Sequence, residues 1–74
     1  MSGNVITDYS PSSLLARRME LGMSQRELAE AVGTTFVDIA KWEIGAKGIP
    51  EDTFSRLAFM LRCNVNDLVN GGKV

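Results

Sequence analysis

The sequence predicts an all-α fold, a compact bundle of five short helices. Three observations lead to this prediction. The chain has 74 residues, which suffice for one domain with one small core. Helix start signals recur along it, each a capping residue or proline followed by apolar residues at a spacing of three to four. No segment alternates polar and apolar residues as a half-buried strand does, so strands are not expected.

The first two expected helices both have start signals with a physical cause. The first follows Ser10 and has Pro11 at its first position, where the missing N–H costs nothing, and Gly22 ends it. The second begins with the sequence SQRE. The Ser24 hydroxyl can accept from the amide of Glu27 while the Glu27 carboxylate reaches back to the amide of Ser24, which makes a capping box. Its apolar stripe consists of Leu28, Ala29 and Val32.

The third expected helix presents an unusual outer surface. Thr35 is its cap, and Asp38 stands where Glu or Gln completes most capping boxes. The helical period turns Ile39 and Trp42 inward. The residues left on the outside are Phe36, Val37, Asp38 and Lys41. Two large apolar side chains therefore face outward beside one acid and one base.

The remaining elements complete the bundle. Pro50 opens a fourth helix, whose buried face carries Phe54, Leu57, Ala58 and Leu61. Asn64 and Asp67 can cap a short fifth helix. We expect residues 1–9 to form a flexible N-terminal arm, residues 10–70 the folded domain and residues 71–74 a short C-terminal tail.

Composition excludes several classes of function. The chain has no histidine, no nucleophile beside a base, no glycine-rich phosphate loop and no spacing typical of metal ligands, so neither an enzyme nor a cofactor or metal site is expected. Cys63 is the one cysteine and is expected to be a small buried residue. Without a basic apolar leader or a long apolar run, the expected location is cytoplasmic, at the nucleoid if DNA is the partner. The net charge of −1 does not by itself indicate nucleic-acid binding.

The connection between the second and third helices points to a function. Gly33-Thr34-Thr35 is a three-residue turn, which suits two helices that cross steeply. This is a helix-turn-helix arrangement. In such a motif the first helix crosses the DNA backbone, and the amino end of the second enters the major groove.

Residues 17–45, RRMELGMSQRELAEAVGTTFVDIAKWEIG, resemble the helix-turn-helix core of the Cro/CI repressor family of lambdoid phages. The similarity continues more weakly through residues 49–68. The matching features are Gly22-x-Ser24-Gln25-x-Glu27-Leu28-Ala29, Gly33, Ile39 and Trp42-Glu43-x-Gly45. The resemblance implies a lambda repressor-like DNA-binding domain and a sequence-specific transcription regulator, most simply a repressor.

The resemblance also implies site residues. The positions that match base readers are Thr35, Phe36, Val37, Asp38 and Lys41, and those that match phosphate contacts are Ser24, Gln25 and Lys47. For Gln25 and Lys47 the alternative is an ordinary solvated side chain. The family pairs an arginine that matches Arg18 with a glutamate that matches Glu43, which implies a structural ion pair.

The chain departs from the family where bases are read. Family members often carry Gln, Ser, Arg or Asn at positions where this chain has Phe36 and Val37. These two can pack on thymine methyl groups, while Lys41 reaches guanine. Asp38 can accept from cytosine, although the role of a helix cap is favoured because a carboxylate near phosphates is electrostatically unfavourable.

Two hypotheses from different classes follow. In the first, a homodimer binds double-stranded DNA at a near-palindromic operator. In the second, the same fold is a protein-interaction module, and a protein partner docks on an apolar patch formed by Phe36, Val37, Ala40 and Ile44. Phe36→Ala separates them, because it should weaken binding to DNA in the first case and to the protein in the second. No membrane partner is expected.

Overall fold

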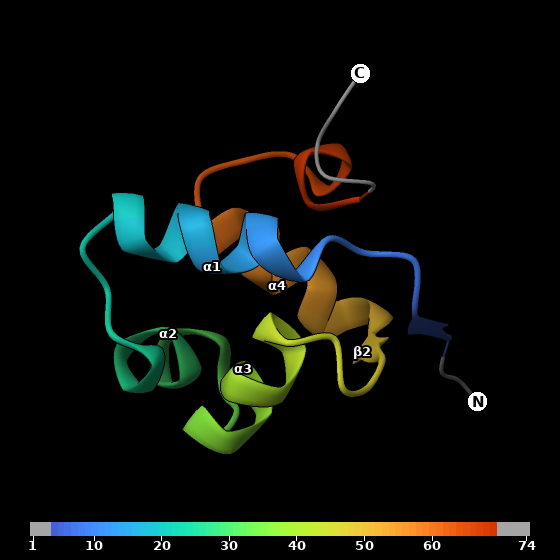
Figure 1. The fold of residues 1–74 in the computed structure, drawn as a ribbon, viewed down its shortest axis with the longest axis horizontal. Helices are drawn as coiled ribbons and strands as arrows, with labels where there is room; N and C mark the ends of the chain where they lie inside the picture. Colours follow the sequence, from blue (N-terminus) through green and yellow to red (C-terminus); the bar gives the residue numbers. More distant parts are fainter. Residues whose placement is uncertain (1–3, 70–74) are drawn as a thin grey trace.

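The computed structural model describes residues 4–69. In this range four α-helices and a short 3-10 helix pack together, with a two-stranded sheet at one side (Figure 1). The helix α1 crosses above α2 and α3 in Figure 1, and α4 lies behind α1. The elements in chain order are β1 (Val5–Ile6), α1 (Pro11–Glu20), α2 (Gln25–Val32), α3 (Phe36–Glu43), β2 (Ile49–Pro50), α4 (Glu51–Met60) and η1 (Val65–Leu68).

The helix starts follow from local hydrogen bonds. The Ser10 hydroxyl accepts from the amide of Ser13 at 3.3 Å and caps α1. The capping box at α2 is complete, with the Ser24 hydroxyl 2.9 Å from the amide of Glu27 and the Glu27 carboxylate 2.8 Å from the amide of Ser24. Each of these bonds satisfies an amide that the helix itself leaves without a partner.

The expected bundle of five helices is corrected in two respects. The last element is a 3-10 helix of four residues, Val65–Leu68, and not an α-helix. Strands are also present, since Val5–Ile6 pairs antiparallel with Ile49–Pro50, so that Ile6 faces Ile49. Segments of two residues are too short to show an alternating pattern. The all-α, helix-turn-helix character of the rest is confirmed.

The segment before α1 lies against the domain from Asn4 onward. Its strand β1 continues into a bond between the carbonyl of Asn4 and the amide of Glu51, at 2.9 Å. The Tyr9 hydroxyl donates to the carbonyl of Lys47 at 2.6 Å. The first three residues of the expected arm, 1–3, and the expected tail, 71–74, lie outside the described residues.

A single core holds the helices together. It is formed by Leu14, Leu28, Ala29, Val32, Ile39, Trp42, Ile49, Phe54, Leu57, Ala58, Leu61 and Leu68. Arg17 adds a polar link between α1 and the end of α4, because its guanidinium donates to the carbonyls of Leu61 and Arg62 at 2.8 and 2.9 Å. Cys63, expected to be buried, is half-buried beside the core, and burial raises the pKa of its thiol.

Candidate nucleic-acid interface

The turn between α2 and α3 is built from residues suited to it. Gly33 has φ of 81°, in the left-handed region that glycine enters without steric penalty, and this ends α2. Two residues later the Thr35 hydroxyl accepts from the amide of Asp38 at 3.2 Å and starts α3. The close succession of the two caps makes the connection short and holds the amino end of α3 beside α2.

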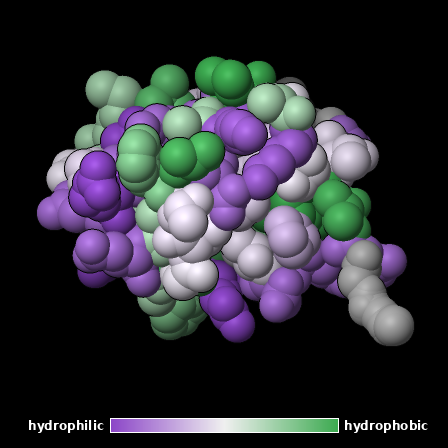
Figure 2. Space-filling model, turned by 90° about the horizontal axis from the view of Figure 1, so that it is seen from below, coloured by the Kyte–Doolittle hydropathy of each residue, from purple (hydrophilic) through white to green (hydrophobic). Residues whose placement is uncertain are grey.

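The outer face of α3 carries the expected base readers. Phe36 is 41% exposed and Val37 47%, and both Thr35 and Lys41 are exposed as well. Ile39 and Trp42 face inward and belong to the core. Figure 2 views the molecule from the side of α2 and α3 and shows hydrophobic side chains among hydrophilic ones on this face. The first turn of α3 therefore presents apolar and polar groups together.

The structure brings Arg18 and Glu43 together as a nearly buried ion pair. The Arg18 Nε lies 2.6 Å from Glu43 Oε2, and Nη2 lies 3.1 Å from Oε1. Their side chains are only 11% and 5% exposed. Gln25 joins them, because its Nε2 donates to Glu43 Oε1 at 2.9 Å. Glu43 thus links α1, the start of α2 and the end of α3.

Gln25 has a more constrained role than the resemblance implied. One of its two amide hydrogens is used by Glu43, which holds the side chain against α3. The second amide hydrogen and the backbone N–H at the first position of α2 are the groups left for an anion. The Ser24 hydroxyl accepts from the amide of Glu27 in the capping box, which leaves its O–H as a donor, and the residue is exposed.

Asp38 and Lys47 form a second polar cluster. The Asp38 carboxylate accepts from Lys47 Nζ at 2.5 Å and from the Thr34 hydroxyl, so it does not reach back to the amide of Thr35 as a capping box requires. These two bonds, that from Lys47 first, hold the pKa of Asp38 below its usual value. Lys47 also lies 5.6 Å from the centre of the Trp42 ring. The pair ties the loop after α3 to the first turn of α3.

One residue of this face was not among those expected. Arg26, the second residue of α2, places its guanidinium 4.6 Å from the centre of the Phe36 ring. The contact is a cation–π interaction between the first turns of the two helices. The available sequence signal was a basic residue near the start of the first helix together with an aromatic residue at the start of the second.

A shallow open groove of about 520 Å³ runs between α1 and α3. Its apolar wall consists of Leu15, Phe36, Val37, Ala40 and Ile44. Leu15 on α1 was not part of the expected apolar patch, and Ile44 is 76% exposed at the end of α3. Its polar wall consists of Arg18, Gln25, Lys41 and Glu43.

Neither a metal centre nor a membrane span is found among residues 4–69. No group of three or more His, Cys, Asp or Glu side chains in this range is placed to hold a metal ion. None of the helices described is long and apolar enough to cross a bilayer.

Comparison with solved structures finds the same fold. The P22 c2 repressor in complex with a synthetic operator is 25% identical with a TM-score of 0.81, and the match covers 92% of this chain and 97% of that one. The clp gene regulator ClgR from Corynebacterium glutamicum is 26% identical with a TM-score of 0.73, covering 77% of this chain. This chain spans 61% of the ClgR chain. The SinR/SinI complex, at 23% identity and a TM-score of 0.74, shares the fold, with 81% of this chain and 59% of that chain covered.

Among curated proteins, none matches this sequence. A model of the helix-turn-helix family matches residues 14–68, which include all four α-helices except the first turn of α1. That match covers most of the chain and includes α2, the turn and α3. The chain belongs to the Cro/CI-type helix-turn-helix family.

Proposed function

We propose that this chain is a sequence-specific DNA-binding transcription regulator that inserts the amino end of α3 into the major groove. The observation that carries the proposal is the exposed first turn of α3, held beside α2 by Gly33 and two successive caps. Family membership and the operator-bound c2 structure support it. The similar structures of ClgR and c2 are described as a gene regulator and a repressor, which supports a regulator and not an enzyme.

The proposed division of labour follows the chemistry of each side chain. Thr35, Phe36, Val37 and Lys41 read base edges, with Val37 against a thymine methyl and Lys41 on guanine. Gln25, with its free backbone N–H, holds a phosphate at the start of α2, beside Ser24, which caps that helix. Asp38 positions Lys47 through their salt bridge. Lys47 contacts a phosphate only where that phosphate competes with the Asp38 carboxylate for the ammonium group.

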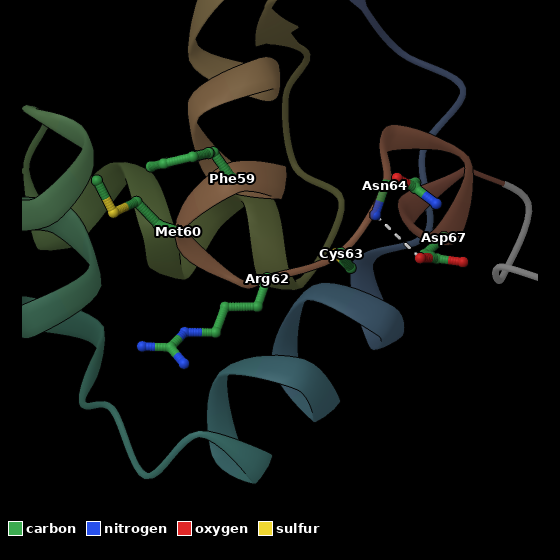
Figure 3. A pocket seen from close by; sticks show the side chains of 6 residues that line it. All are labelled: Phe59, Met60, Arg62, Cys63, Asn64 and Asp67. Atoms are coloured by element: carbon green, nitrogen blue, oxygen red, sulfur yellow. Dashed lines mark hydrogen bonds between the residues drawn. The ribbon is translucent and has the colours of Figure 1, made fainter.

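We further infer that the regulator is a repressor that binds a near-palindromic operator as a homodimer. The surface offered for dimerisation is the end of α4, where Phe59 is 77% exposed. Phe59 and Met60 line one side of an open groove of about 640 Å³, and Asn64, the cap of η1, and Asp67 within η1 line the other (Figure 3). Phe59→Glu should shift the sedimentation of the DNA-bound species from two protomers to one, while an unchanged dimer would exclude this surface.

The direct test of DNA binding is selection of bound duplexes from a random pool. A regulator of this kind should enrich one sequence with internal two-fold symmetry. Fluorescence anisotropy with that duplex should then give a shallow salt dependence, because each neutralised phosphate contributes about −0.9 to the slope and this face has few cations. No enrichment at low salt, or a slope near about −10, would contradict the proposal.

The groove between α1 and α3 favours a second candidate, a docking site for an apolar protein segment. Leu15 lies on α1 and Ile44 directly follows α3, both outside the first turn of α3, so substitutions there separate the two functions. If α3 reads DNA, Ile44→Ser should leave the affinity for the selected duplex within about twofold. If the groove docks a protein, Ile44→Ser should weaken that complex while DNA selection by the wild type yields no sequence.

A further inference from the structure

We infer that Arg26 is a DNA phosphate contact and that Phe36 is the platform that positions it. The inference rests on the proposed function and adds a residue and a role to it. Arg26 is the second residue of α2, and Phe36 is the first residue of α3. Their contact, 4.6 Å from guanidinium carbon to ring centre, therefore lies where the two helices of the motif begin.

The charge of Arg26 is not neutralised by a neighbour. Within residues 4–69 the salt bridges are Arg17 with Glu20, Arg18 with Glu43, and Lys47 with Asp38. Arg26 belongs to none of these, and its side chain donates no hydrogen bond to the described residues. It is exposed, so its charge is available to an external anion.

The geometry of the contact leaves the donors of the guanidinium usable. A guanidinium is planar, and its five N–H groups point outward in that plane. The guanidinium carbon of Arg26 lies over the Phe36 ring, which limits the rotamers of Arg26, and the N–H groups have no hydrogen-bond acceptor among the described residues. Such a side chain can bind one phosphate through two parallel hydrogen bonds.

The position in the motif selects phosphate over base. The first helix of a helix-turn-helix crosses the DNA backbone, and Arg26 is in the first turn of that helix. Phe36 is then covered on one side by Arg26, which explains why a large aromatic ring is tolerated on the surface. The Phe36 ring thus supports the contact of Arg26 with the DNA backbone, in addition to any contact of its own with a thymine methyl group.

The test compares Arg26→Ala, Phe36→Leu and the double variant with the wild type. Each is measured by anisotropy on the selected duplex and on a scrambled duplex of equal length, between 50 and 200 mM salt. Wild-type binding to the selected duplex tests the proposed function independently, and the variants test this inference. Arg56→Ala removes the same charge from α4 and serves as the matched control, and thermal unfolding verifies that each variant is folded.

We expect Arg26→Ala to weaken binding to both duplexes by the same factor and to reduce the salt slope by about 0.9 per protomer. The ratio of wild-type affinity to Arg26→Ala affinity should then fall about 3.5-fold for each Arg26 when the salt concentration rises fourfold. Phe36→Leu should weaken binding to both duplexes. On the scrambled duplex, where no base is read, the double variant should bind no more weakly than Arg26→Ala alone.

Three outcomes would overturn the inference. An unchanged slope in Arg26→Ala, or an equal change in Arg56→Ala, would show that no phosphate is bound by Arg26. A loss confined to the selected duplex would make Arg26 a base reader. Additive losses in the double variant on the scrambled duplex would show that Phe36 does not act through Arg26.

Discussion

Removal of the Glu43 carboxylate should destabilise the domain severely. Glu43→Ala deletes three hydrogen bonds, at 2.6, 2.9 and 3.1 Å, and leaves the Arg18 guanidinium nearly buried without its counter-charge. Breaking a buried pair in this way costs about 3–5 kcal/mol. A domain of this length has a free energy of unfolding of roughly 4–11 kcal/mol, so the loss is a large part of the total.

Urea denaturation measures this effect. With an m value of about 1.5 kcal/mol/M, the midpoint of Glu43→Ala should fall by about 2–3 M. Glu20→Ala is the matched control, because it breaks the exposed ion pair between Glu20 and Arg17, both on α1. It should lower the free energy of unfolding by less than about 1 kcal/mol. Replacing both charges, as Arg18→Met with Glu43→Leu, should recover most of the stability. A Glu43→Ala midpoint equal to that of Glu20→Ala would refute the reasoning.

Three further predictions concern stability, each read from the denaturation midpoint. The lowered pKa of Asp38 stabilises the fold above the unfolded pKa of about 3.8, and this stability is lost as pH falls through the folded value. The denaturation midpoint of wild type should therefore exceed that of Asp38→Asn at neutral pH and equal it at acid pH. A difference in midpoint that does not change with pH would contradict this prediction. Arg62 has φ of 58°, so Arg62→Gly should stabilise by about 0.5–1 kcal/mol, and a lower midpoint would show that no strain is relieved. A Cβ at Gly48 would lie 2.3 Å from Val5 Cγ1, so Gly48→Ala should cost about 1–3 kcal/mol, part of which Val5→Ala should restore; no rescue would exclude this clash.

The parts of the fold that could be predicted from the sequence depend on bonds between near neighbours. The caps at Ser10, Ser24 and Thr35 each join residues three apart, so residue type and spacing suffice to identify them. The inward turn of Ile39 and Trp42 likewise follows from the helical period alone. Along this stretch the capping residues and the apolar period indicate the same helices, which is why the helix-turn-helix can be identified from the residues themselves.

The rest depends on contacts between residues distant in the sequence. The β1–β2 pairing joins Ile6 to Ile49, which are 43 residues apart in the sequence, and each strand is too short to have a period. It also needs Gly48, whose missing Cβ gives Val5 room. The partners of Gln25 and Asp38 were missed for a related reason, because long polar side chains choose among several acceptors only when the helices are packed.

The role of Phe36 was only half predictable. Its outward direction follows from the period of α3, and the structure has it on the surface. The residue that covers it, Arg26, lies on another helix, and a cation–π contact has no fixed spacing in sequence.

The measurement that tests the central claim most directly is a second selection from a random DNA pool with Val37→Gln. The claim is that the outer face of α3 reads bases, with Val37 on a thymine methyl group. Glutamine pairs with the N6 and N7 edge of adenine, so the preferred base should change from thymine to adenine at one position of each half-site and nowhere else. An unchanged preferred sequence, obtained with a variant that is folded and still binds DNA, would contradict the account.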